Sequence, residues 1–519
     1  MKSDKLLDAI GMIDADLIAQ ADKTVNKSNI RYLKWVVPVA ATLLIVVAII
    51  PFLKQDKPDI DNPIIEQTTG GDNFSGGQTQ PNEDEPSTEI PDLPIIIPSL
   101  DDNPLKPMVY SIKKVEYPEM VQYPSDWMNS DWDSMQAWYN SKKERREYYG
   151  AGKNLDVFLK KTYKEFLSDS NSKNRLYSPL NVYMALAMTA EITDGESRQQ
   201  ILDLLGAESI DALRKQANSI WNANYSDDGA VTSILASSIW LNKSIKFNEK
   251  TLEFLTTNYY ASSYQGQMGS DEMNIAFRSW LNEQTGGMLS NQIDNMELDA
   301  ETVMALATTI FYQARWDLEF QEKNTEKGIF HSPIGDITCD FMCHKEYNDD
   351  YYWGNKFSAV GRKLANSGNM FFILPDENVS VNDLLSDNEA LSFMASNGKW
   401  SNSKRIRINL SAPKFDVSSN IDLKDGLISL GVTNCFDSRK SDFSPLCNND
   451  GLSISKVEHG VRVTIDEEGV VASAFTVEPL AGSVPPSDEI VDFILDRPFI
   501  FVITSEDGLP LFTGVVNQP

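Results

Sequence analysis

The chain has 519 residues, of which 75 are acidic and 46 are basic, and its formal net charge at pH 7 is −29. A protein this acidic repels phosphate groups, and we therefore expect no nucleic-acid partner. The length exceeds that of a typical domain, which predicts one large globular region with additional segments attached to it.

Residues 1–34 are predicted to form an amphipathic cytoplasmic segment. Apolar side chains recur there at helical spacing, and Ser3 is suited to cap the helix. The apolar residues are Leu6, Leu7, Ile10, Ile13, Leu17 and Ile18. Such a segment either rests near the inner face of a membrane or docks on a cytosolic partner.

Residues 35–53 form an apolar run of 19 residues without a charge. A helix of about 20 residues is long enough to cross a bilayer. Basic residues precede the run and acidic residues follow it, which favours a cytoplasmic N-terminus and an extracellular remainder. A cleaved signal peptide is the alternative, but the run is long for one and residues 50–54 offer no small-residue cleavage site. The sequence thus predicts a single-pass protein of the cell membrane, anchored by a transmembrane helix at residues 35–53.

Two segments of different composition follow the apolar run. Residues 54–107 are rich in Pro, Gly, Asp, Asn and Thr, a composition that cannot bury a core and predicts a disordered linker. Residues 108–150 contain many aromatic side chains, among them Trp127, Trp132, Trp138, Tyr148 and Tyr149. This aromatic-rich extension either packs on the globular domain, which is expected at residues 151–519, or binds a neighbouring molecule.

The sequence offers no catalytic or metal-binding motif. Its three histidines are His331, His344 and His459, and they lie in no metalloprotease, hydrolase or phosphate-loop pattern. Cys339, Cys343 and His344 make a poor zinc signature because no second cysteine pair accompanies them. Cys435 and Cys447 complete the set of four cysteines, whose disulfide state stays open. We therefore expect no enzyme activity, no metal and no cofactor.

The most informative segment runs from Asp466 to Thr476. Two strand-like stretches, 452–457 and 461–465, precede it, and it continues through Gly469 into small and β-branched residues. Gly469 can act as a backbone joint, and small side chains can slide between packed neighbours. Residues Pro479, Gly482, Pro485 and Pro486 follow and suit an exposed loop. The segment is therefore predicted to be a loop whose first part can become a strand.

This segment resembles the hinge of a serpin reactive loop, and several other motifs resemble the same family in the same order. They are residues 176–182 with 185–188, 277–287, 306–316, 412–415, 430–432, 496–501 and 510–517. The resemblance implies an α+β serpin fold, with three β-sheets, about nine helices and an exposed reactive-centre loop. It further implies a bacterial, membrane-anchored member in which the transmembrane helix and the disordered linker precede the serpin domain.

The resemblance also implies a mechanism and a set of site residues. A protease cleaves the loop as a substrate, the hinge inserts into the main sheet as a new strand, and the acylated protease is trapped. The implied hinge residues are Glu467, Gly469, Val470, Ala472, Ala474 and Thr476. The implied sheet-opening residues are Ser178, Asn181, Thr308 and His459. Val470 departs from the family's usual hydroxyl residue, and Thr308 stands where an asparagine is common.

The reactive bond is predicted between Ser483 and Val484, within a window bounded by Leu480 and Ser487. Ser483 is the residue reached from Gly469 by the hinge length typical of the family. Leu480, Ala481 and Ser483 present no basic side chain, so the expected targets are elastase-like or subtilisin-like serine proteases, with cysteine proteases as a further option. The alternative function is a non-inhibitory binding or signalling module with the serpin fold.

Overall fold

The computed structural model describes residues 41–51 and 109–519, apart from residues 125–131, 153, 171 and 470–488. The strand at residues 41–51 and residues 109–519 belong to one compact unit. The described helices include none with the length and apolar character needed to cross a membrane. The predicted segments 1–34 and 54–107 lie outside the described residues.

The strands are β1 (Ala41–Pro51), β2 (Val109–Lys113), β3 (Arg175–Tyr177), β4 (Ser226–Asp227), β5 (Thr232–Asn242), β6 (Ala261–Gly266), β7 (Met304–Gln313), β8 (Glu326–Ser332), β9 (Gly335–Trp353), β10 (Phe357–Lys363), β11 (Asn369–Pro375), β12 (Ser403–Pro413), β13 (Phe415–Asp422), β14 (Leu452–Ile465), β15 (Ile490–Ile494), β16 (Phe499–Thr504) and β17 (Pro510–Val516). The α-helices are α3 (Trp132–Arg145), α4 (Asp156–Leu167), α5 (Pro179–Glu191), α6 (Gly195–Leu205), α7 (Ile210–Asn224), α8 (Glu249–Tyr259), α9 (Asp271–Gln284), α10 (Ser290–Ile293), α11 (Val381–Leu385), α12 (Asn388–Met394) and α13 (Lys424–Ser429). Three short 3-10 helices are η1 (Arg146–Tyr148), η2 (Glu322–Asn324) and η3 (Asn434–Phe436).

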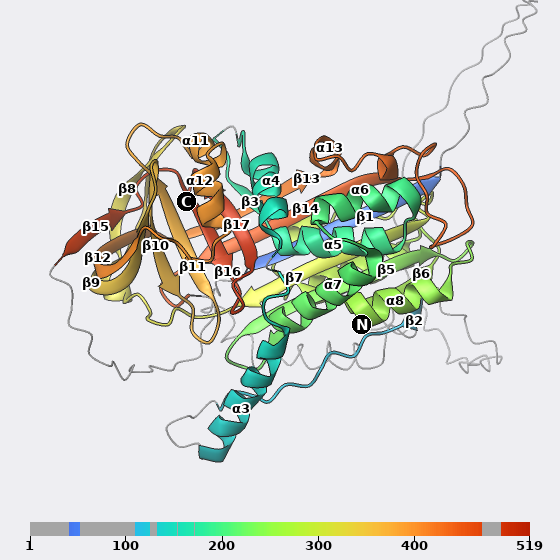
Figure 1. Ribbon diagram of the computed structural model, residues 1–519, viewed down its shortest axis with the longest axis horizontal. Helices are drawn as coiled ribbons and strands as arrows, with labels where there is room; N and C mark the ends of the chain where they lie inside the picture. The colour runs from blue at the N-terminus through green and yellow to red at the C-terminus, as the bar shows by residue number, and fades with distance from the viewer. Residues whose placement is uncertain (1–40, 52–108, 125–131, 153, 171, 470–488) are drawn as a thin grey trace, which may run out of the picture. The chain divides into compact units, whose positions relative to one another are not determined.

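The main sheet has the strand order β13-β14-β1-β7-β5-β6-β2, with β4 paired to β5 (Figure 1). β1 runs antiparallel to both β7 and β14, so these two strands are parallel to each other. They flank one strand position, which we call the insertion site. In this structure β1 occupies the insertion site along most of its length.

Residues 41–51 therefore form a strand here, where a transmembrane helix was expected. The expectation rested on an apolar run, and an apolar run is equally typical of a strand buried on both faces of a sheet. The run is also rich in β-branched valine and isoleucine, which favour strands. Within the sheet, the backbone N–H and C=O groups of β1 find hydrogen-bond partners in the strands on both sides. In a lipid bilayer a helix would pair the same groups within itself.

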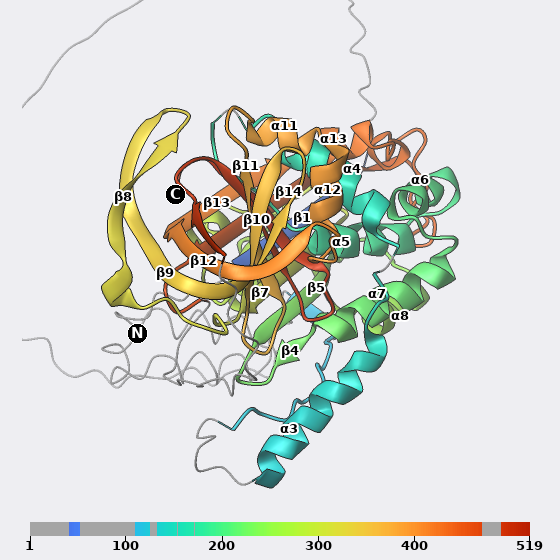
Figure 2. The same ribbon diagram turned by 60° about the vertical axis from the view of Figure 1, so that its left-hand side comes forward.

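The other strands are hydrogen-bonded in one nine-stranded series, which the long, curved strand β9 divides into two further sheets (Figure 2). β8 and β12 pair with β9 along much of its length, and β15 extends this group by pairing with β12. β10 pairs with the end of β9 and leads through β11, β16 and β17 to β3. The expected three sheets are thus present. The described residues hold eleven α-helices rather than nine, and two of these, α10 and α11, are only four and five residues long.

Helix α5 lies beneath the main sheet and is buried along its whole length. Ser178 caps it by accepting a hydrogen bond from the Asn181 backbone N–H, and Pro179 occupies the first turn, where no intrahelical donor is needed. Both faces of this helix can be apolar because it packs between the main sheet and its neighbouring helices. Its cap brings Ser178 and Asn181 under the insertion site.

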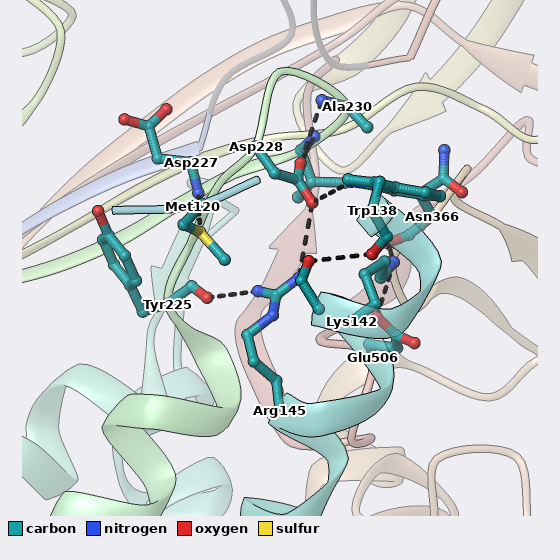
Figure 3. A network of polar contacts seen from close by, with 12 residues as sticks. Met120, Trp138, Lys142, Arg145, Tyr225, Asp227, Asp228, Ala230, Asn366 and Glu506 are labelled. Carbon is teal, nitrogen blue, oxygen red and sulfur yellow. Dashed lines mark hydrogen bonds and ion pairs between the residues drawn. The ribbon is translucent and has the colours of Figure 1, made fainter. Parts of the chain in front are cut away.

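The aromatic-rich extension packs on the globular domain, one of its two expected alternatives. Strand β2 pairs with β6 at the edge of the main sheet, and Trp138 of α3 is 1% exposed. The Trp138 indole N–H donates to Asp228, and Arg145 lies 3.5 Å from the same carboxylate (Figure 3). Lys142 donates to the Asn366 carbonyl and pairs with Glu506 at 2.9 Å. The extension is thereby attached to loops that are far apart in the sequence.

Replacing Asp228 with alanine should detach α3. The change leaves the indole of Trp138 and the guanidinium of Arg145 without their buried acceptor, which we expect to cost about 3 kcal/mol. Thermal unfolding of the Asp228→Ala chain should show a Tm lower by about 5 °C or more. Asp227→Ala is the matched control because its side chain is exposed; an equal loss in both variants would contradict the assignment.

Candidate functional site

The hinge begins where β14 ends. Asp466 and Gly469 form a bridge, and Gly469 also bridges to Arg315, which follows β7. Gly469 has φ +96°, and a Cβ added to it would lie 2.3 Å from the Trp316 backbone nitrogen. Only glycine therefore fits. The two bridges direct the chain that leaves β14 toward the insertion site between β7 and β14.

The Glu467 carboxylate fastens the hinge to the neighbouring sheet. It lies 2.6 Å from the Lys414 ammonium and accepts a hydrogen bond from the Thr325 hydroxyl at 2.6 Å. Burial opposes its ionisation, but these two partners outweigh burial and hold the pKa of Glu467 below its usual value. The Glu467 backbone carbonyl also accepts from the Phe320 N–H. Glu467 thus anchors the base of the loop on two sides.

Asp466 is the acid of the same turn whose ionisation is disfavoured by burial. Burial, with the nearby acids Glu467 and Glu468, raises the pKa of Asp466 to about 6, although the Glu468 N–H donates to its side chain. Its backbone carbonyl accepts from the Trp316 indole at 2.9 Å. A raised pKa in the folded state means that the protonated carboxyl stabilises the fold. This contribution is present at acidic pH and is lost as the pH rises through about 6.

The sheet-opening residues meet beneath the insertion site. His459 of β14 is fully buried, and its Nε2 accepts the Ser178 backbone N–H at 3.1 Å. Burial lowers the pKa of His459 to about 3, so the imidazole is neutral at ordinary pH. The Asn181 amide donates to the Thr308 carbonyl of β7 at 3.1 Å. Helix α5 therefore contacts both strands that flank the insertion site.

Two polar atoms at this point lack a partner among the described residues. They are the Thr308 hydroxyl and the His459 Nδ1. In the sheet register both residues lie opposite Ile45 of β1, which carries no polar side-chain atom. At this point of the insertion site β1 therefore supplies an apolar residue type, whereas the flanking strands carry hydrogen-bonding side chains.

The loop itself lies outside the described residues. This applies to Val470, Ala472, Ala474 and Thr476, to the reactive bond Ser483–Val484 and to its window from Leu480 to Ser487. Of the predicted hinge residues the structure describes Glu467 and Gly469, and it brings the predicted sheet-opening residues Ser178, Asn181, Thr308 and His459 together.

Sequence reasoning missed several residues that hold the hinge. Trp316 and Lys414 lie within the family motifs 306–316 and 412–415, which predict no contact with the hinge, and Thr325 lies in none of the motifs. Each acts through a contact with Asp466 or Glu467 from a distant segment, so no local pattern could reveal it.

The cysteines and histidines form no second site. All four cysteines are unpaired thiols; Cys435 and Cys447 are buried, and Cys339 and Cys343 are half-buried. Within the described ranges no group of His, Cys, Asp or Glu side chains is suited to hold a metal ion. His331 pairs with Asp336 at the surface.

A family model described as "Serpin (serine protease inhibitor)" matches residues 153–519. The chain belongs to the serpin family. Serpin-ZX of Arabidopsis thaliana is 27% identical over 369 residues, which cover 67% of this chain and 93% of that protein. Alpha-1-antiproteinase of Rattus norvegicus is 28% identical, covering 72% of this chain and 90% of that protein. The native-state structure of the thermophilic serpin tengpin aligns with a TM-score of 0.63 at 24% identity, covering 79% of this chain and 100% of that chain.

Family membership confirms the serpin fold and the absence of enzyme activity, because serpins are protease inhibitors and not enzymes. Serine proteases are the targets typical of the family. In this serpin Asp466 and Glu467, at the base of the loop, contact Trp316 and Lys414. In the main sheet, β14 and β7 contact the N-terminal end of α5 through His459–Ser178 and Thr308–Asn181.

Replacing Asp466 with asparagine should stabilise the hinge at neutral pH. The amide keeps the acceptor for the Glu468 N–H and removes the charge whose burial is costly above about pH 6. We expect a Tm higher by about 2 °C at pH 7.5 and a difference that disappears below the ordinary aspartate pKa, where the carboxyl is protonated in both the folded and the unfolded chain. Glu253→Gln, at an exposed acid of α8, is the control. A rise that persists at such acidic pH would contradict the charge explanation.

Proposed function

We propose that the protein is a suicide inhibitor of serine endopeptidases that traps an acyl-enzyme by inserting its cleaved loop between β7 and β14. The observation that carries this proposal is the pair of bridges at Gly469, to Asp466 and to Arg315. They start a strand at the end of the insertion site before the loop is cut. After cleavage the loop can continue this strand without rearranging the hinge.

The register of these bridges supports the predicted inward positions. Continued in antiparallel fashion, it would place Ala472 opposite Val463 and Ala474 opposite Val461. Both valines are buried on the core face of β14. Thr476 would lie between Thr308 and His459, where its hydroxyl would be placed to hydrogen-bond the Thr308 hydroxyl or the His459 Nδ1, which have no partner among the described residues. Side chains of one strand alternate between the faces, so Ser473 and Phe475 would point outward.

The length of β14 supports the predicted reactive bond. β14 has 14 residues and begins at Leu452. The same register would bring Ser483 opposite Leu452, so a loop cut after Ser483 would pair along the whole strand and no further. A cut at the bond between Ser483 and Val484 therefore gives the longest insertion that β14 can accept. The sequence near this bond favours elastase-like and subtilisin-like enzymes, whose pockets take small apolar side chains.

Incubation with pancreatic elastase or subtilisin tests the proposal, using the full chain in phosphatidylcholine nanodiscs. We expect an SDS-resistant complex and release of a C-terminal fragment that starts at Val484. Mass spectrometry of this fragment identifies the bond. Cleavage at this bond without any complex would favour the alternative, a non-inhibitory serpin-fold binding or signalling module.

A charge at an inward position should convert the inhibitor into a substrate. Ala474→Glu places a carboxylate opposite Val461, where it would be buried without a partner, a cost of several kcal/mol. We expect the loop to be cut at an unchanged rate and the yield of complex to fall at least tenfold. Ser473→Glu is the matched control because position 473 would face outward, opposite Arg462, which pairs with Asp416. Equal trapping by both variants would refute the register.

We further propose that residues 35–53 anchor this serpin in a bacterial cell membrane, with the serpin domain outside and residues 1–34 in the cytoplasm, accessible to a cytosolic partner. The uncharged run and its basic flank support this arrangement. Protease treatment of intact cells should release the serpin domain by cutting within residues 54–107. A mature soluble form that begins near residue 54 would instead indicate a signal peptide.

A further inference from the structure

The insertion site is occupied by the chain's own apolar segment. β1 pairs with β14 from Ala41 opposite Val463 and with β7 from Ala41 opposite Tyr312. Gly469 bridges to Asp466 and to Arg315. If this antiparallel register continued along β14 and β7, Ala472 would lie opposite Val463 and Tyr312, which are the partners of Ala41. In the same register Thr476 would lie at the position that Ile45 occupies, opposite His459 and Thr308. β1 thus has the direction and the register that an inserted loop would have.

The sequence of β1 suits this site. The strand position between β7 and β14 is covered by α5 on one face, whereas on the other face α9 packs against the neighbouring strand β7. A strand at this position needs apolar residues on the α5 face, and Ala41–Pro51 carries a single polar side chain, Thr42. The 57 residues between Pro51 and Val109 are long enough to let the segment reach the site or leave it.

We propose that residues 41–51 are an intramolecular occupant of the insertion site that competes with the reactive loop. While β1 is in the sheet, a cleaved loop finds the backbone groups of β7 and β14 already paired and cannot insert beyond the hinge. The protease then completes hydrolysis, and the chain behaves as a substrate. When the segment leaves, for instance into a bilayer, the site opens and trapping becomes possible. This inference rests on the proposed inhibitory function.

The two destinations of the segment exclude each other. In the sheet, β1 satisfies its backbone groups with two neighbouring strands. In a bilayer, residues 35–53 would satisfy them within a helix. The same apolar residues serve both, so membrane attachment and inhibitory capacity would be coupled through one segment. A chain that has lost its membrane would be inactive toward proteases.

Occupancy can be tested without any protease. In the T42C/F311C chain the two altered positions lie opposite each other in the register, whereas in T42C/T309C they are displaced by two residues. Cysteines can be bridged only when their Cα atoms are within about 7 Å. Oxidation of the lipid-free monomer should link T42C to F311C at least tenfold more than T42C to T309C, as mass spectrometry of the linked peptides would show. Equal or absent linkage would overturn the proposal. Transfer of the T42C/F311C chain into phosphatidylcholine nanodiscs before oxidation should reduce the linkage.

Competition is tested with Val46→Pro. Proline removes a ladder hydrogen bond from a central strand, whereas a membrane helix tolerates it. Gln55→Pro, beyond the strand, is the control. In lipid-free buffer with subtilisin or elastase, we expect the unaltered and Gln55→Pro chains to be cut with little complex, and the Val46→Pro chain to form at least tenfold more. In phosphatidylcholine nanodiscs all three should form complex.

The outcomes separate this inference from the proposed function. If the T42C/F311C linkage forms but no chain traps protease under any condition, the segment occupies the site and the inhibitory function is refuted. If the linkage is absent and the lipid-free unaltered chain traps protease as well as Val46→Pro, the function stands and the competition is refuted. If Val46→Pro yields no soluble lipid-free monomer, comparison of the unaltered chain in buffer and in nanodiscs decides, since equal trapping in both would overturn the proposal.

Discussion

β7 and β14 run parallel on either side of one strand position, and each directs a row of backbone N–H and C=O groups toward it. Buried backbone groups without partners are costly, so this position must be filled by a strand or closed by movement of the sheet. The rest of the fold is arranged around this requirement. Helix α5 contacts both strands through Ser178 and Asn181, and the bridges of Gly469 lie at the end of the strand position between them.

The contacts at the hinge and those beneath the sheet differ in their physical character. At the hinge, Glu467 is held by an ion pair with Lys414 and a hydrogen bond from Thr325, so charge fixes the base of the loop. Beneath the sheet, burial keeps His459 neutral and leaves it a single acceptor contact with the Ser178 backbone. A neutral and weakly bonded contact is easier to break than a buried ion pair. The sheet is therefore expected to yield in its middle while the hinge remains attached.

The extension at residues 108–150 adds the last strand at one edge of the main sheet. Strand β2 covers β6, which would otherwise end the main sheet, and the Trp138–Asp228 contact fastens α3 near the start of β5. β2 is thereby the edge strand of the main sheet on this side, and it is only five residues long. A short edge strand offers few backbone groups to another molecule, whereas the interior position between β7 and β14 is long enough for the chain's own segments to compete for it.

The family and the placement of its hinge could be recognised from the sequence alone, because Gly469, the small residues after it and the ordered motifs are local features. The inward positions Val470, Ala472, Ala474 and Thr476 remain a prediction that rests on the alternation of side chains along a strand. The sequence could not decide the conformation of residues 41–51, since an apolar run without charges suits both a bilayer and an interior strand position of a sheet. It also could not reveal Lys414, Thr325 and Trp316 as holders of the hinge, because each reaches Asp466 or Glu467 only after distant segments have packed together. Those decisions belong to the tertiary structure, which alone determines which backbone groups lack a partner and which segment lies close enough to supply one.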